Sequence, residues 1–202
     1  MTSAKSFLAV ICALGLGTAA LAQDTAAPET GADAEAPAAE AGTTAPQPPQ
    51  PGQTYIRETH GDFELRCVKL PEDRAEDDPC ALYQLLENAE GQAVAEFSIF
   101  RLPEGGQAVA GATLVAPLET LLTQDVQMRV DQGPVRRYPF TYCNAGGCLA
   151  RLGFTAEEVE RLKRGAKAEI RLVSAAAPDR EFFLPLSLTG FTAGYAQVSE
   201  RN

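Results

Sequence analysis

The stretch DFELRC at residues 62–67 decides the fold class, because polar and apolar residues alternate strictly along it. Successive side chains of a β-strand point to opposite faces of the sheet, so Phe63, Leu65 and Cys67 are expected to share one buried face. The same alternation recurs later in the chain, at residues 125–130, 167–172 and 182–188. The sequence therefore predicts a set of strands that each bury one face.

Turn-forming residues separate the predicted strands at short intervals. Residues 81–86 and 93–102 are further strand candidates, and the turn residues 88–91 between them predict a hairpin. Turns rich in Gly, Pro or Asn follow at 103–106, 131–134 and 144–147. Many short strands with frequent turns favour an all-β domain built as a two-sheet sandwich.

One α-helix is predicted among these strands. Thr155 followed by Glu158 is a capping box, in which each side chain satisfies a backbone N–H at the start of a helix. Lys163 and Arg164 suit the negative end of the helix, and Gly165 is a natural stop. A short helical turn is also expected after Gly190, near the C-terminus.

The N-terminal residues 1–22 are typical of a secretory signal peptide. Lys5 supplies the positive charge, residues 7–20 are apolar, and a small-x-small cleavage motif ends at Ala22, directly before Gln23. The apolar run is shorter than the roughly 20 residues that a membrane-spanning helix needs. We therefore expect cleavage between Ala22 and Gln23, and a mature chain without a transmembrane segment that works in the periplasm or at the outer surface.

Residues 23–53 differ from the rest of the chain in composition. They contain no large aliphatic or aromatic side chain, they are rich in Ala and Pro, and all of their charged residues are acidic. Such a stretch cannot bury enough apolar surface to offset the entropy of ordering, which predicts a disordered acidic linker. Residues 54–202 then form one domain of ordinary size.

The predicted domain contains four cysteines, and an even number in an exported chain indicates disulfides. Three pairings are open, and we favour Cys67–Cys80 and Cys143–Cys148, because each pair is close in sequence and flanks a predicted turn. A site with four thiolate ligands for zinc is the alternative. Structural zinc sites usually show a short Cys-x-x-Cys spacing, which this chain lacks.

Motifs that carry chemistry are few. The chain has a single histidine, His60, which is expected in a solvated turn, and we predict no catalytic residue, no bound metal and no cofactor. The acidic loop at 72–78 is expected to be solvated, with a weak cation site as the alternative. The chain has 17 basic and 27 acidic residues and a net charge of −10, which disfavours nucleic-acid binding because that needs a basic face.

Four segments carry a resemblance that none of them would carry alone. They are GDFELRC at 61–67, DPC at 78–80 followed by Leu82 and Gln84, YCNAGGC at 142–148 and PLSLTGFT at 185–192. Together they resemble the invasion-associated locus B family of exported proteins from alphaproteobacteria. Phe63 stands where that family tends to have Trp, and this chain has no Trp.

The resemblance implies an immunoglobulin-like β-sandwich with one small helix, in the periplasm or at the outer surface. It transfers no catalytic residue. We therefore expect a non-enzymatic exported protein that contacts an unknown protein or envelope component through its surface. The alternative is a periplasmic carrier of a small ligand, or an enzyme, with a pocket near residues such as Glu64, Arg66 or Arg137. The apolar segment 111–122 is expected to pack in the core, with an exposed edge strand as its alternative.

Overall fold

The structure is a computed structural model that describes residues 48–74 and 76–200. The predicted signal peptide, its cleavage site at Ala22–Gln23 and the predicted linker up to residue 47 lie outside the described residues, so these expectations stay predictions. The first strand begins at Thr54. The boundaries expected for the linker and the domain stay predictions.

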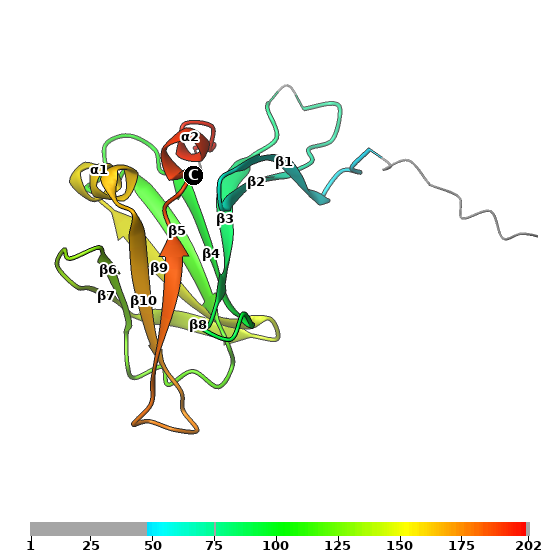
Figure 1. Cartoon of the computed structure of the whole chain (residues 1–202). Helices are drawn as coiled ribbons and strands as arrows, with labels where there is room; N and C mark the ends of the chain where they lie inside the picture. Colours follow the sequence, from blue (N-terminus) through cyan, green and yellow to red (C-terminus); the bar gives the residue numbers. More distant parts are fainter. Residues whose placement is uncertain (1–47, 75, 201–202) are drawn as a thin grey trace, which may run out of the picture. The chain divides into compact units, whose positions relative to one another are not determined.

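Two antiparallel sheets make up the fold, as expected for an all-β sandwich (Figure 1). The larger sheet has seven strands, in the order β1 (Thr54–His60), β2 (Phe63–Val68), β3 (Cys80–Glu87), β4 (Ala93–Arg101), β5 (Ala110–Ala116), β9 (Gly147–Phe154) and β8 (Phe140–Asn144). The smaller sheet has four, in the order β11 (Glu181–Ser187), β10 (Lys167–Val173), β6 (Val126–Val130) and β7 (Arg136–Tyr138). The strands β1 to β5 follow one another in both the chain and the larger sheet, so they form a meander.

The core lies between the two sheets and follows the predicted alternation. Phe63 and Leu65 of β2 are fully buried, as are Val126 of β6 and Ile170 of β10. Phe182 departs from this pattern because it is 40% exposed at the start of β11, close to the β10–β11 turn at one end of the sandwich. The segment 111–122 packs in the core only as far as Ala116, since Leu118 and Leu122 are exposed in the following loop.

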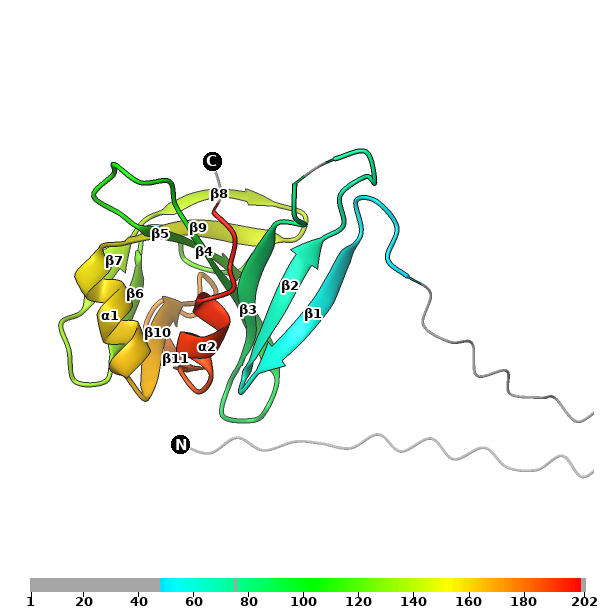
Figure 2. The same cartoon turned by 90° about the horizontal axis from the view of Figure 1, so that it is seen from above.

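Two helices, α1 (Ala156–Arg164) and α2 (Phe191–Tyr195), lie at the same end of the sandwich (Figures 1 and 2). The predicted capping box is present: Thr155 accepts a bond from the backbone N–H of Glu158, whose carboxylate accepts one from the N–H of Thr155. The helix ends before Gly165, which has a φ of −72°. Glycine is needed there for space, because an added Cβ would lie 2.7 Å from a methyl group of Val130.

A junction of backbone and polar side chains joins the two sheets near α2. Gln84 of β3 is 7% exposed; its amide nitrogen donates to the carbonyls of Asp62 and Ser187, and its amide oxygen accepts from the N–H of Ser187. Gly61 and Gly190 approach each other beside it, both with positive φ, and an added Cβ on Gly190 would lie 2.0 Å from the carbonyl oxygen of His60. Three of the segments that carried the family resemblance therefore meet at one structural junction.

Candidate functional site

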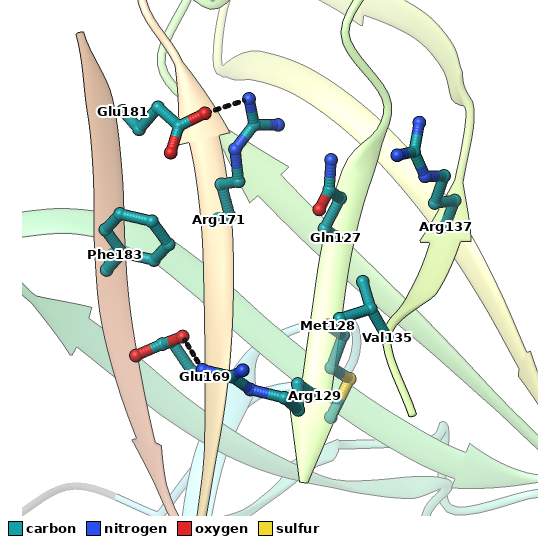
Figure 3. A pocket seen from close by; sticks show the side chains of 9 residues that line it. All are labelled: Gln127, Met128, Arg129, Val135, Arg137, Glu169, Arg171, Glu181 and Phe183. Atoms are coloured by element: carbon teal, nitrogen blue, oxygen red, sulfur yellow. Dashed lines mark hydrogen bonds and ion pairs between the residues drawn. The ribbon is translucent and has the colours of Figure 1, made fainter. Parts of the chain in front are cut away.

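The outer face of the four-stranded sheet carries a hollow of about 400 Å³ (Figure 3). Its side chains come from the strand positions that alternate with the buried ones, which is why they point away from the core. Neighbouring strands bring together residues that are far apart in sequence. The charged and polar residues of the hollow are Gln127, Arg129, Arg137, Glu169, Arg171 and Glu181.

Two ion pairs cross this face from strand to strand. Arg129 of β6 donates to Glu169 of β10 over 2.8 Å, between residues that are direct partners in the sheet. Arg171 of β10 donates to Glu181 of β11, and this hydrogen bond lowers the pKa of the Glu181 carboxyl. Partly exposed pairs of this kind contribute little to stability, because solvent screens them. Their larger effect is to hold two guanidinium groups in fixed positions.

The hollow has more hydrogen-bond donors than acceptors. One nitrogen of each paired arginine, Nε of Arg129 and Nη1 of Arg171, is buried and has no hydrogen-bond partner within residues 48–74 and 76–200. Arg137 on the edge strand β7 is exposed, and no carboxylate of the described residues pairs with it. Three guanidinium groups therefore stand against two carboxylates, and both carboxylates are already engaged.

Apolar surface borders these charges. Phe183 of β11 is 51% exposed and Val135, directly before β7, is 49% exposed, and both line the hollow. Aromatic residues and arginine are enriched in the cores of protein–protein interfaces, where lysine and glutamate are depleted. The face thus combines fixed charges, one unpaired cation and accessible apolar surface.

Glu64 and Arg66, the other predicted pocket residues, lie on the larger sheet and do not line this hollow. Arg66 is bonded to Glu64 over 2.7 Å and its guanidinium stacks over the ring of Tyr83 at 3.2 Å. A wider hollow of about 560 Å³ does lie on the larger sheet, over Gly111 and Gly153, but Arg151 is the one charged side chain among its lining residues. It offers little to recognise a specific polar ligand.

His60 is not the solvated turn residue that the sequence suggested. Its side chain is 10% exposed at the end of β1, with Nε2 lying 3.4 Å from a carboxylate oxygen of Glu58. The prediction was wrong because α2 covers the ring: an added Cβ on Gly194 would lie 3.2 Å from its Cδ2 atom. His60 therefore contributes to the packing of β1 against α2 at Gly194.

The acidic side chains of the loop at 72–78 differ in their exposure and bonding. Glu72, Asp73, Glu76 and Asp77 are exposed, as expected of a solvated loop. Asp78 is instead held by the hydroxyl of Tyr55, the N–H of Leu70 and the ammonium group of Lys69, at 2.7, 2.8 and 3.4 Å. Within the described part of the chain no group of three or more His, Cys, Asp or Glu side chains is arranged to hold a metal ion.

The four cysteines form two cross-strand disulfides, in the pairing that the sequence favoured. Cys67–Cys80 joins β2 to β3, and both cysteines are buried. Cys143–Cys148 closes the β8–β9 hairpin, with Cys143 exposed and Cys148 buried. These bonds hold the sheet but lie outside the hollow.

Comparison with known proteins places this fold. The family model described as "Invasion associated locus B (IalB) protein" matches residues 64–199. This chain belongs to the invasion-associated locus B family. The IalB match spans both disulfides and every residue that lines the hollow on the smaller sheet.

Curated relatives agree with this assignment. The invasion protein B homologs of Brucella abortus strain 2308 and of biovar 1 strain 9-941 are each 26% identical over 148 residues, covering 73% of this chain and 81% of the relative. The crystal structure of invasion associated protein B from Bartonella henselae has a TM-score of 0.58 and 23% identity, covering 72% of this chain and 93% of that one. The structural relative shows that this IalB chain shares its fold.

The residues of the hollow were only partly accessible to sequence reasoning. Arg137 was named, but Arg129, Glu169, Arg171 and Glu181 were not. The available signal was the phase of the predicted strands, since residues 125–130 and 167–172 place arginine on the outward face of both. That these two strands are neighbours could not be read from the chain.

None of the helices within residues 48–74 and 76–200 is long and apolar enough to cross a membrane.

Proposed function

We propose that this IalB-family chain is an exported, non-enzymatic protein that contacts a protein or another component of the cell envelope through the outer face of its four-stranded sheet. The observation that carries the proposal is that, within residues 48–74 and 76–200, Arg137 has no carboxylate partner and shares one sheet face with half-exposed Phe183 and Val135. Such a combination supports recognition of a partner, because it joins apolar area to a charge that lacks an internal partner.

The scaffold supports a role in surface contact outside the cytoplasm. Two disulfides cross-link the larger sheet, and structural disulfides persist in oxidising compartments such as the periplasm and the cell surface. The two ion pairs fix Arg129 and Arg171 before any partner arrives, so less side-chain entropy is lost on binding. The relatives carry the word invasion in their names, but the proposal needs only an envelope partner.

Site-specific photo-cross-linking in intact cells tests the proposal. Val135→p-benzoylphenylalanine places the reactive group beside the hollow, and Leu85→p-benzoylphenylalanine is the matched control at a residue that is 44% exposed on the larger sheet. We expect a discrete cross-linked partner at position 135 that is absent at position 85 and is lost with Arg137→Glu. Identical adducts at both positions, or none at either, would contradict surface recognition at this face.

Export is tested in the same cells. The predicted signal peptide requires a mature chain that begins at Gln23 and fractionates with the periplasm or the outer surface. Intact mass measurement of the protein from each fraction checks this. A full-length chain starting at Met1 in the cytoplasm would contradict the localisation.

A carrier of a small anionic ligand is the second candidate. It is favoured by the volume of the hollow, about 400 Å³, which lies in the range of small-molecule sites, and by its surplus of donors. Native mass spectrometry of the protein purified from its own cells distinguishes the two. A stoichiometric added mass that Arg137→Gln removes would favour the carrier over the contact protein.

A further inference from the structure

The charge balance of the hollow determines what it can accept. Glu169 and Glu181 each bond one arginine, and within residues 48–74 and 76–200 neither of them pairs with Arg137. Arg137 lies directly opposite Gln127 in the β6–β7 register, and Figure 3 shows the Gln127 amide between Arg137 and Arg171. A negative group seated here would meet the unpaired guanidinium of Arg137 together with the side-chain amide NH2 of Gln127.

Carboxylate matches the geometry of a guanidinium. Its two oxygens match two parallel N–H groups of arginine, and charge-assisted bonds of this kind are about twice as strong as neutral ones. A polyanion such as nucleic acid is disfavoured by the net charge of −10 on the chain and by the two carboxylates in the hollow itself. A single carboxylate would neutralise a face whose three arginines exceed its two glutamates by one charge.

The apolar border specifies what should accompany that carboxylate. Phe183 and Val135 both line the hollow and are about half exposed. Val135 lies two residues from Arg137, whereas Phe183 lies on β11 at the opposite edge of the sheet (Figure 3). An aromatic or branched side chain adjacent to the acidic group would cover Val135 and gain from removal of apolar surface from water. A polypeptide supplies this combination whenever an acidic residue stands next to an aromatic one.

We propose that the hollow on the four-stranded sheet recognises an acidic peptide segment of a partner protein, in which a carboxylate pairs with Arg137 and a neighbouring apolar side chain covers Val135. This inference rests on the proposed function and names the ligand class for the same face. Arg129 and Arg171 balance the two glutamates that hold them, so that Arg137 leaves the face with one net positive charge.

Capped dipeptides test the ligand class with the whole mature protein. The probe is N-acetyl-Phe-Glu-amide, and N-acetyl-Phe-Gln-amide is the matched neutral peptide of nearly the same shape. Binding is followed by NMR chemical shifts of the ¹⁵N-labelled protein. We expect the acidic peptide to bind about tenfold more tightly than the neutral one, with the largest shifts in β6, β7 and β10.

Two variants separate the role of Arg137 from general electrostatics. Arg137→Gln should weaken the acidic peptide about tenfold and leave the neutral peptide unchanged. Arg151→Gln removes the same charge from the exposed face of β9 on the other sheet and should change neither affinity. Equal weakening by both variants, or equal affinity for both peptides, would overturn the proposal.

Inorganic phosphate serves as the competing anion. If it displaces the acidic peptide at the same or lower concentration, the hollow is a general anion site and the assignment to peptide carboxylate is wrong. The outcome is independent of the cross-linking result. A partner captured at position 135 together with no binding of the acidic dipeptide leaves the proposed function standing and removes only this inference.

Discussion

Single residues decide where the two sheets meet. Gly61 and Gly190 both have positive φ and lie so close that a Cβ on either one would overlap backbone atoms of the other's segment. The N–H of Asp62 donates to the carbonyl of Thr189 in the same place, over 3.2 Å. Glycine is required here for two separate reasons, conformation and space, whereas most turn glycines need only the first.

The first prediction separates these two requirements. Gly91→Ala changes a residue with a φ of +75° and no neighbouring atom within 4 Å of the added Cβ, so it should cost about 1 kcal/mol. Gly190→Ala has a similar φ of +84° but places the Cβ 2.0 Å from the carbonyl oxygen of His60, so it should cost about 3 kcal/mol or more. Urea unfolding measures both. Equal losses would show that the backbone moves aside without strain.

Asp78 gives a prediction in acid. The N–H of Leu70 and the hydroxyl of Tyr55 hold the pKa of the Asp78 carboxyl below its ordinary value. A lowered folded-state pKa means that the ionised carboxylate stabilises the fold above about pH 4, and that this stabilisation is lost as pH falls through the folded-state pKa.

The measurement for Asp78 is the melting temperature as a function of pH. Asp78→Asn should lower the melting temperature at pH 7 and make its decline below about pH 4 less steep than in the unchanged protein. Asp77→Asn is the control, because the side chain of Asp77 is next to Asp78 in sequence but is exposed. Parallel acid profiles for all three proteins would mean that Asp78 does not contribute in this way.

At the scale of elements, local signals were reliable where one face of an element is buried. Strands formed where alternation predicted them, at about 62–67, 125–130 and 167–172. The capped helix formed directly after Thr155, as its capping box predicted. Gly165 ends the helix as predicted but for a different reason, since its φ is not left-handed and its neighbours Val130 and Leu188 fill the space of a side chain. That reason lies in the packing of another strand and is invisible in the helix itself.

The two disulfides differ in exposure and in loop length, which makes them separable. Limited reductant should open Cys143–Cys148 first, because Cys143 is exposed while Cys67 and Cys80 are buried. Removing the disulfide that closes the shorter loop should also lower the free energy of unfolding by less. The chain-entropy model gives a loss of about 2 kcal/mol for Cys143–Cys148 and about 3 kcal/mol for Cys67–Cys80.

Mass mapping of alkylated cysteines at increasing reductant checks the order of reduction. The paired Cys→Ser variants of each bridge, compared in urea, check the energies. Reduction of Cys67–Cys80 first would mean that the β2–β3 edge opens more easily than the β8–β9 hairpin. It would also argue against the larger sheet acting as a rigid support.

For the whole molecule, Gln84 is the polar link between the sheets. Its amide serves three backbone groups, the carbonyls of Asp62 and Ser187 and the N–H of Ser187. Gln84→Leu keeps the volume similar but leaves these groups unpaired, so it should lower the free energy of unfolding by about 3 kcal/mol. Gln124→Leu, at an exposed loop position, should change it by less than about 0.5 kcal/mol. A small loss of stability in Gln84→Leu would mean that water forms the hydrogen bonds that the amide makes in the unchanged protein.

The sequence by itself determined which residues face inward in the middle of the strands, since alternation along a strand is a local property of the backbone and buried apolar side chains enforce it. Phe182, at the exposed start of β11, is the exception. It also limited the sulfur chemistry, because two pairs of cysteines each flank a short turn. Only the tertiary structure decided that β10 lies between β6 and β11, which gathers Arg129, Glu169, Arg171 and Glu181 into one hollow. Strand neighbours far apart in sequence are chosen by how the two sheets pack as a whole, and no local pattern records that choice.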